Sequence, residues 1–169
     1  MQFIKLVKKR YSCRNFLSKP IHKKLIEKII EAARWAPTAR NIQPWEFIVI
    51  TEREKLKKLG ELAMPNGLFI ADAGCCIAVF CKDTKYYLED GCAATENILL
   101  ASAELGLGSC WVAGDKKPYV EEIKKMLNVG ADFKLVSLVA LGYPKDKKAF
   151  ANTNRQKRPL KKLIHWEVF

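Results

Sequence analysis

Two short apolar runs constrain the fold of this chain most. Residues 74–81 read Gly-Cys-Cys-Ile-Ala-Val-Phe-Cys, and residues 135–142 read Leu-Val-Ser-Leu-Val-Ala-Leu-Gly. Each run is too short for a typical helix, and its apolar residues follow one another instead of alternating with polar ones. That pattern is typical of strands covered on both faces, so we expect two buried strands in the core.

Segments with other patterns surround these two runs. Further strands are expected over residues 45–50 and 109–113, and helices over residues 3–10, 21–33, 51–62, 87–105 and 118–127. Pro20 suits the first turn of the second helix, Pro37 stops it, and Thr51 is a plausible N-cap of the third. Four strands among five helices predict a layered α+β or α/β fold, in a single domain over residues 1–169.

The cysteines and the apolar segments bear on where the protein is found. No apolar run approaches the roughly 18–20 residues that a membrane-spanning helix needs, and the N-terminus lacks the apolar stretch of a signal peptide. The six cysteines include no C-x-x-C pair, and three of them lie in the run 74–81. We expect them to be packing residues rather than metal ligands, in a cytoplasmic protein that does not bind a membrane.

Two polar runs near the N-terminus are candidates for ligand binding. In an extended segment Arg10, Ser12 and Arg14 fall on the same side, because side chains alternate along the chain. Two guanidinium groups and a hydroxyl suit a phosphate dianion. The second run, 36–45, is polar and bounded by prolines, so its backbone is held in a fixed, non-helical arrangement that can face a flat polar ring.

The net charge of +12 comes from the two ends of the chain. Residues 1–28 hold nine Lys or Arg and one Glu, and residues 145–169 hold eight Lys or Arg, one Asp and one Glu. A nucleic-acid surface is one interpretation, and convergence of both ends on one anionic ligand is another. The third is that the lysines are simply solvated on helix faces.

Several motifs that would carry chemistry are missing. No G-x-G-x-x-G follows a strand, and neither a G-x-x-x-x-G-K-[ST] loop nor a G-x-S-x-G elbow is present. The two histidines are isolated from any cysteine or serine pattern, so no acid, base or nucleophile stands out. Such a chain can still be an enzyme when a cofactor carries the chemistry.

Five blocks, read together, resemble the FMN-dependent nitroreductase family. They are Arg-x-Ser-x-Arg-x-Phe at 10–16, Ala-Pro-Thr-Ala-x-Asn-x-Gln-Pro-Trp at 36–45, Gly-Leu-Gly-Ser-Cys-Trp at 106–111, Ala-Leu-Gly-Tyr-Pro at 140–144, and Lys-Arg-Pro-Leu with a later His-Trp in 157–166. The blocks keep the family's order. The resemblance implies a central, mostly antiparallel sheet flanked by helices, a homodimer with FMN at the interface, and an extended C-terminal tail docking on the partner subunit.

The resemblance assigns the first block to the flavin. Arg10 and Ser12 would hold phosphate or ribityl oxygens, and Tyr11 would contribute backbone contacts. Arg14 matches a basic position near the N1/O2 edge of the flavin, where positive charge stabilises the reduced anionic ring. The alternative for Arg10 and Arg14 is ordinary surface charge.

The loop that each subunit lends to the other's flavin is matched by Pro37, Thr38, Ala39 and Asn41. Thr38 and Asn41 could instead only satisfy a turn between prolines. Asn66 faces the same choice between the flavin site and an ordinary Asn-Gly turn.

The strand end facing flavin N5 is matched by Val112, Ala113 and Gly114. The C-terminal basic pair at the phosphate is matched by Lys157 and Arg158, and the sequence does not say which of the two makes the contact. Cys110 adjoins the strand end and is expected to be a packing residue.

The implied reaction is a ping-pong hydride transfer from NAD(P)H through flavin N5 to an electron-poor acceptor of the nitroaromatic or quinone type. The protein supplies orientation and electrostatics, so no catalytic side chain and no metal ligand is assigned. Two alternatives stay open: a different flavin reaction on the same fold (flavin-consuming, dehalogenating or azoline-oxidising), and a basic nucleic-acid-binding module. The sequence does not distinguish NADH from NADPH, and it does not identify the segment that covers the flavin.

Overall fold

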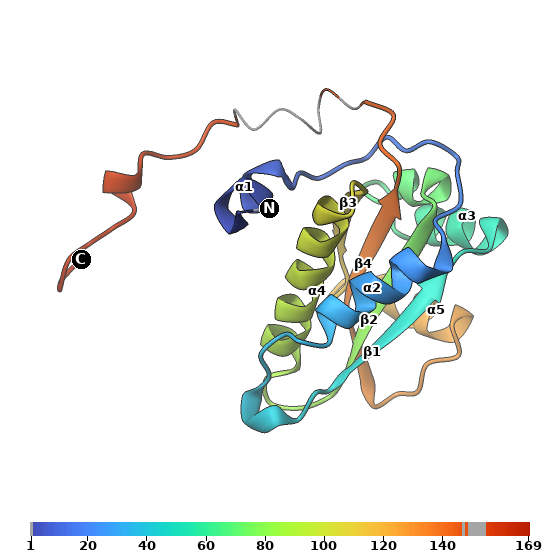
Figure 1. Ribbon diagram of the computed structural model, residues 1–169. Coiled ribbons are helices and arrows are strands. Elements are labelled where there is room, and N and C mark those ends of the chain that lie inside the picture. Colours follow the sequence, from blue (N-terminus) through green and yellow to red (C-terminus); the bar gives the residue numbers. More distant parts are fainter. Residues whose placement is uncertain (1, 147, 149–154) are drawn as a thin grey trace.

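A four-stranded antiparallel sheet forms the centre of the computed structural model, which describes residues 2–146, 148 and 155–169 (Figure 1). The strands are β1 (Trp45–Ile50), β2 (Cys75–Lys82), β3 (Gly108–Ala113) and β4 (Phe133–Gly142), in the spatial order β1-β2-β4-β3. β2 and β4 occupy the middle of the sheet. These are the two apolar runs of the sequence, and their prediction as buried strands is confirmed.

Helices cover both faces of the sheet. They are α1 (Phe3–Lys9), α2 (Lys23–Ala33), α3 (Arg53–Leu62), α4 (Tyr87–Glu104) and α5 (Val120–Met126), with 3-10 turns at η1 (Ala39–Asn41), η2 (Leu68–Asp72) and η3 (Leu160–Lys162). Ile77 and Val79 of β2 pack in the cluster that includes α2 and α4, whereas Ala78 and Phe80 pack in the cluster that includes α3 and α5. Alternate side chains of one buried strand thus pack into the apolar layers on opposite faces of the sheet. The predicted α+β fold is confirmed.

Two details of the helix starts were wrong. Pro20 lies outside α2, which begins at Lys23, and the imidazole Nδ1 of His22 caps it by accepting a hydrogen bond from the Lys24 amide at 3.2 Å. Histidine is not a preferred N-cap, so the proline was the more prominent signal. α3 starts one residue later than expected, because Glu52 rather than Thr51 holds the N-cap position.

The N-terminal segment after α1 runs beside the sheet edge formed by β3. Ser12 forms a parallel bridge with Ser109 in β3, and the Cys13 amide donates to the Ser109 carbonyl at 2.9 Å. Further along, Phe16 forms a bridge with Pro144 and is fully buried. The segment that carries the first polar run is therefore fixed next to β3.

The described part of the C-terminal tail is extended and exposed, and it projects away from the sheet and helices (Figure 1). One contact returns it to the N-terminal segment: the Arg155 guanidinium donates to the Arg10 carbonyl at 2.7 Å and also to the Lys8 carbonyl. Among the described helices, none combines the length and the hydropathy needed to cross a membrane.

Candidate functional site

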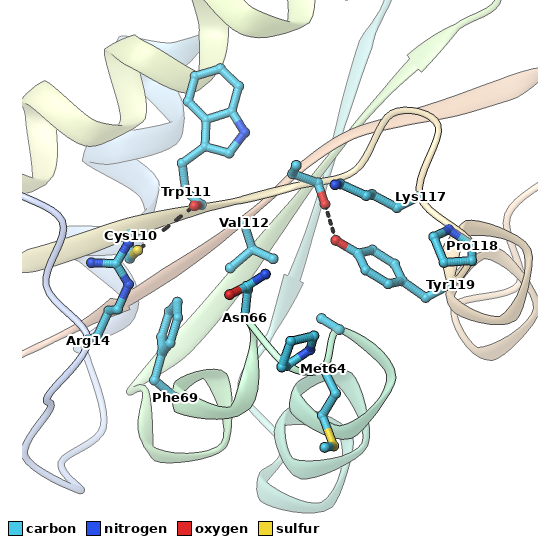
Figure 2. Close-up of a pocket in the computed structure, with 13 residues that line it drawn as sticks. Arg14, Met64, Asn66, Phe69, Cys110, Trp111, Val112, Lys117, Pro118 and Tyr119 are labelled. Atoms are coloured by element: carbon cyan, nitrogen blue, oxygen red, sulfur yellow. Dashed lines mark hydrogen bonds between the residues drawn. The ribbon is translucent and has the colours of Figure 1, made fainter.

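A cavity of about 320 Å³ lies at the open end of β3 (Figure 2). Four parts of the chain line it: the N-terminal segment, the connection from α3 to η2, β3 itself, and the loop from β3 to α5. The lining residues are Arg14, Ala63, Met64, Pro65, Asn66, Phe69, Cys110, Trp111, Val112, Ala113, Lys117, Pro118 and Tyr119. Two cations contribute to this lining, and no carboxylate does within the described part of the chain.

Arg14 supplies the positive charge at one end of the cavity. Its guanidinium carbon lies 5.8 Å from the centre of the Phe69 ring, within the range of a cation–π contact. One guanidinium nitrogen also donates to the Ser12 carbonyl at 3.4 Å. The side chain is thus held by an aromatic ring and by its own backbone, which leaves the remaining N–H groups available to a ligand.

Cys110 and Trp111 of β3 form part of the cavity wall, with Cys110 only 1% exposed. Burial raises the pKa of the Cys110 thiol, although the nearby charges of Arg14 and Arg10 act in the opposite direction. A thiol with a raised pKa is a poor nucleophile at neutral pH. Cys110 is therefore a packing group in this wall, and Trp111 both lines the cavity and packs against the core.

The end of β3 is held from outside the sheet by Tyr119. Its hydroxyl donates a hydrogen bond to the Ala113 carbonyl (Figure 2), and burial raises the pKa of that hydroxyl, which keeps it protonated as a donor. Gly114 follows, and its amide donates to the Val136 carbonyl at 3.1 Å. A Cβ at Gly114 would lie 2.7 Å from the Leu135 carbonyl oxygen, so only glycine fits against β4 there.

The second polar run forms a strained loop fastened to α4. The Thr38 hydroxyl and the Ala39 amide both donate to the buried carboxylate of Asp90, at 2.8 and 3.2 Å. Arg40 and Asn41 have φ angles of 55° and 56°, in the left-handed region that costs about 1–3 kcal/mol for a non-glycine residue. A backbone of this kind persists only where its surroundings enforce it, which is consistent with a ligand-binding loop.

The structure brings together some of the expected site residues and separates others. Arg14, Val112 and Ala113 line one cavity, and Gly114 is buried directly behind it. The remaining expected residues do not line it. The segment before Arg14 holds Arg10, Tyr11 and Ser12, and the loop on α4 holds Pro37, Thr38, Ala39 and Asn41. The tail holds Lys157 and Arg158, both exposed. Their roles at the flavin stay predictions.

Sequence reasoning missed part of the cavity wall. Asn66, whose role was left open, does line the cavity, together with Phe69 from η2 and Lys117 and Tyr119 after β3. The Asn-Gly pair at 66–67 was weighed as an ordinary turn, but a turn motif does not say which surface it faces. The Gly-Asp-Lys-Lys-Pro run after β3 was the one available signal for Lys117.

Comparison with known proteins places the whole chain in one family. A family model described as "Nitroreductase family" matches residues 7–73, and a model described as "Putative TM nitroreductase" matches residues 60–168. A protein of Archaeoglobus fulgidus named "Putative NADH dehydrogenase/NAD(P)H nitroreductase" is 38% identical over 164 residues, which is 92% of this chain and 93% of that protein.

Two further relatives match most of the chain. An iodotyrosine deiodinase of Thermotoga neapolitana is 30% identical over 85% of this chain and 89% of its own. The solved structure of an FMN-dependent nitroreductase from Clostridium difficile superimposes with a TM-score of 0.86 at 27% identity, covering 99% of this chain and all of that one. With five sequence blocks, the sheet order and these matches in agreement, this chain belongs to the nitroreductase family.

Proposed function

We propose that this protein is an FMN-dependent oxidoreductase that takes electrons from NAD(P)H and delivers them to an electron-poor acceptor of the nitroaromatic or quinone type. The relatives named as NAD(P)H nitroreductases support an NAD(P)H-dependent oxidoreductase, and the FMN-dependent structural neighbour supports FMN as its cofactor. The nitroaromatic or quinone type of acceptor rests on the likeness to relatives named nitroreductases.

The observation that carries this proposal is the lining of the cavity. Of its 13 residues none is a Ser, His, Asp or Glu, in the part of the chain that is described. The Cys110 thiol has a raised pKa, and the Tyr119 hydroxyl is engaged with a backbone carbonyl. Such a wall can orient and polarise a bound group, and it offers little for general acid–base or nucleophilic catalysis.

The residues present fit FMN. The Arg14 guanidinium stands where it can stabilise negative charge on a ring. The end of the edge strand β3, at Val112 and Ala113, can offer backbone groups to a flat polar ligand. The phosphate would be held by Arg10 and Ser12, with Lys157 or Arg158 of the tail. When bound, FMN supplies two-electron chemistry by accepting a hydride at N5 and passing electrons to the acceptor.

The chain's own residues have positioning roles in this reaction. Arg14 binds and polarises, Asn66 offers an amide with both donors and an acceptor, and Phe69 closes the wall beside Arg14. Tyr119 and Gly114 keep the end of β3 in place against β4. No proton transfer by a side chain is assigned.

We also infer a homodimer of single-domain subunits in which each tail docks on the other subunit. Trp166, Val168 and Phe169 are each more than three-quarters exposed in the single chain, and large apolar groups gathered at one end usually mark an interaction surface. The loop of Pro37, Thr38, Ala39 and Asn41 does not line this chain's cavity, which is consistent with its use by a second copy. Nitroreductase family members are typically dimers, which favours the same assembly. Sedimentation of the full chain and of a chain ending at Arg158 tests this, because loss of the tail should shift a dimer to monomer.

A cytoplasmic location completes the proposal. The six cysteines are free, and five of them are buried, which suits a reducing compartment. The basic ends of the chain are assigned to the flavin phosphate rather than to nucleic acid, and the Arg155 contact with the Arg10 carbonyl supports their convergence. Steeply salt-dependent binding of duplex DNA by flavin-free protein would contradict that assignment.

Reductive dehalogenation is the second candidate, because a relative that spans the same fold is named iodotyrosine deiodinase. Release of iodide from iodophenols by the reduced holoprotein, measured with an iodide electrode, would favour it over the nitroaromatic or quinone acceptor.

The first experiment is an absorption spectrum of the purified protein, recorded before and after anaerobic addition of NADH or NADPH. A two-banded flavin spectrum that bleaches supports the proposal and identifies the donor. Absence of flavin, with no uptake from added FMN, contradicts it.

A further inference from the structure

The charges that line the cavity are all of one sign. Arg14 and Lys117 lie at opposite ends of it, while Asn66 and Tyr119 supply neutral polar groups (Figure 2). A cavity with two cations and no carboxylate among its described lining residues attracts anions and repels cations. Arg14 is already used by the proposed cofactor site, whereas nothing in the proposed reaction uses Lys117.

The loop that carries Lys117 is fixed on both sides. Before it, the Tyr87 hydroxyl donates to the Asp115 carboxylate at 2.6 Å, and the Lys117 amide closes a turn on the Gly114 carbonyl at 3.2 Å. After it, Pro118 restricts the backbone of Lys117 to extended conformations. The lysine therefore stands on a defined backbone at the rim of the cavity, where a long side chain can reach a ligand.

The adjacent lysine differs in its surroundings. The Lys116 ammonium lies 3.9 Å from an Asp115 carboxylate oxygen, and Lys116 does not line this cavity. Its charge is partly balanced by Asp115. Both lysines border a neighbouring groove with Glu121 and Lys134, so the difference between them is that Lys117 also lines the cavity. Of two consecutive lysines with the same charge and length, only Lys117 faces the proposed acceptor site, which makes Lys116 a matched control.

We propose that Lys117 is a specificity-determining residue that selects electron acceptors bearing a carboxylate or another anionic group. The inference deepens the proposed function and rests on it for the electron transfer. The acceptor's anionic substituent would meet the ammonium of Lys117 at the rim, while its electron-poor ring enters the cavity. Because the side chain is exposed, the expected preference is modest and falls as ionic strength rises.

Two acceptors of nearly the same shape test this proposal: 4-nitrobenzoate, which is an anion, and 4-nitrobenzamide, which is neutral. The ratio of kcat/KM for the acid to that for the amide in the wild-type holoprotein is the reference, and its change on substitution carries the test. Lys117→Gln should lower this ratio about threefold to fivefold through KM, with kcat unchanged, since a single exposed charge contact is lost. Lys117→Glu should lower it further, and Lys116→Gln should leave it unchanged.

Calorimetric titration of the oxidised holoprotein gives a readout that needs no turnover. The dissociation constant for 4-nitrobenzoate should rise about threefold to fivefold in Lys117→Gln, and that for the amide should stay the same. An unchanged acid-to-amide ratio in Lys117→Gln overturns the proposal. An equal change in Lys116→Gln also overturns it, because the effect would then come from the overall positive charge of the loop and not from a contact with Lys117. The proposal is also overturned if Lys117→Gln changes only the preference for NADPH over NADH, since Lys117 would then bind the electron donor and not the acceptor.

Failure of the proposed function looks different from failure of this inference. Discrimination between acid and amide in the calorimeter, with neither compound reduced, would keep the anion site and contradict the oxidoreductase. Reduction of both compounds without discrimination between them would support the oxidoreductase and contradict the anion site at Lys117.

Discussion

The carboxylate of Asp90, in the first turn of α4, accepts a hydrogen bond from the Thr38 hydroxyl at 2.8 Å and joins two positions 52 residues apart. A second oxygen of the same carboxylate accepts from the Ala39 amide at 3.2 Å. Asp90 is 5% exposed and its two partners are half-buried, and hydrogen bonds to a charged group contribute about 1.5–3 kcal/mol each. The strained loop depends on this anchor.

Replacing Asp90 should therefore release the loop. Asp90→Ala is expected to lower the free energy of unfolding by about 2–3 kcal/mol, because a half-buried hydroxyl and a half-buried amide lose their acceptor. If the loop is lent to the cofactor of a second copy, the dissociation constant for FMN should rise at the same time. Urea unfolding and fluorescence titration of FMN measure the two effects.

Glu89→Ala is the matched control for Asp90→Ala. Glu89 precedes Asp90 in the first turn of α4, so both variants lose one negative charge near the helix N-terminus. Glu89 is exposed, and its variant should change stability by less than about 0.5 kcal/mol. Equal losses in the two variants would mean that the helix dipole, and not the loop contact, explains the effect of Asp90.

Replacing Arg14 should reduce FMN affinity more than it reduces the free energy of unfolding. Arg14→Ala removes an exposed guanidinium at the end of the cavity, so stability should change by less than about 1 kcal/mol. FMN affinity should fall about tenfold or more, and the flavin should become harder to reduce, because a positive charge near the ring is lost. Titration with FMN and spectroelectrochemistry measure these changes.

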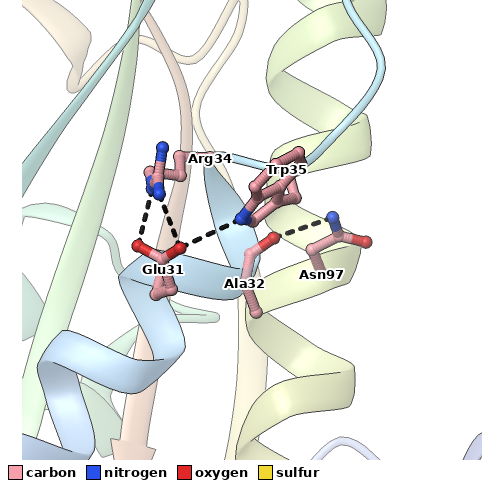
Figure 3. Close-up of polar contacts among 5 residues, drawn as sticks. All are labelled: Glu31, Ala32, Arg34, Trp35 and Asn97. Atoms are coloured by element: carbon pink, nitrogen blue, oxygen red, sulfur yellow. Dashed lines mark hydrogen bonds and ion pairs between the residues drawn. The ribbon is translucent and has the colours of Figure 1, made fainter.

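The control for Arg14 is Arg34, whose guanidinium is paired with Glu31 through two hydrogen bonds of 2.6 and 2.7 Å near the end of α2 (Figure 3). The Trp35 indole donates to the same carboxylate, and the neighbouring Ala32 carbonyl accepts from Asn97 of α4. Arg34→Ala removes the same charge outside the cavity. Unchanged flavin affinity in Arg14→Ala, or an equal loss in Arg34→Ala, would remove Arg14 from the site.

The sheet was predictable from sequence because burial on both faces leaves a continuous apolar signal. β2 and β4 were expected within two residues at every end, since no polar residue has to alternate in them. The helix starts were harder: the cap of α2 uses His22, and the N-cap of α3 has no side-chain hydrogen bond. An N-cap without the usual side-chain hydrogen bond does not require Ser, Thr, Asp or Asn, so the sequence carries no signal for where the helix begins.

The candidate site was predictable only where residues in or beside a family block line the cavity themselves. Arg14 stood in the first block and Ala113 just after the third, and both line the cavity. Phe69 and Tyr119 act through three-dimensional neighbours, one stacking on Arg14 and the other bonding the Ala113 carbonyl. The Phe69 contact joins segments 55 residues apart, and the Tyr119 contact spans only six residues but depends on how the loop after β3 turns back. Nothing in the local sequence of either aromatic residue encodes its partner.

The contact between Tyr87 and Asp115 should make stability depend on alkaline pH. The hydrogen bond to Asp115, followed by burial, raises the pKa of Tyr87 to about 12. A raised folded-state pKa means that the stabilisation is complete below the unfolded value of about 10 and is lost as pH rises toward 12. The wild-type chain should therefore exceed Tyr87→Phe in free energy of unfolding by a constant amount from pH 7 to 9, and by less above pH 10.

Denaturant unfolding at a series of pH values tests this expectation, with Tyr86→Phe as the control. Tyr86 is the adjacent tyrosine and is 40% exposed, so its variant should show no such pH dependence against the wild type. A difference between wild type and Tyr87→Phe that stays constant through pH 11 would mean that the hydrogen bond to Asp115 does not hold in solution.

Gly114 should tolerate no side chain, because it sits where β3 leaves the sheet against β4. A Cβ at Gly114 would lie 2.7 Å from two atoms of Leu135, its carbonyl oxygen and its side-chain Cγ, and 2.9 Å from the carbonyl carbon of Val136. Backbone atoms of a central strand cannot move aside cheaply, so Gly114→Ala is expected to cost about 1–3 kcal/mol of unfolding free energy. The shifted strand end should also weaken FMN binding.

Gly130→Ala distinguishes this close approach from the general cost of replacing a glycine. A Cβ at Gly130 would meet only the side-chain oxygen of Asp132, which is exposed and can rotate away. That variant should stay within about 0.5 kcal/mol of the wild type in the same denaturant unfolding. If Gly114→Ala is equally mild and keeps its affinity for FMN, the end of β3 is not the rigid wall that the proposed flavin site requires.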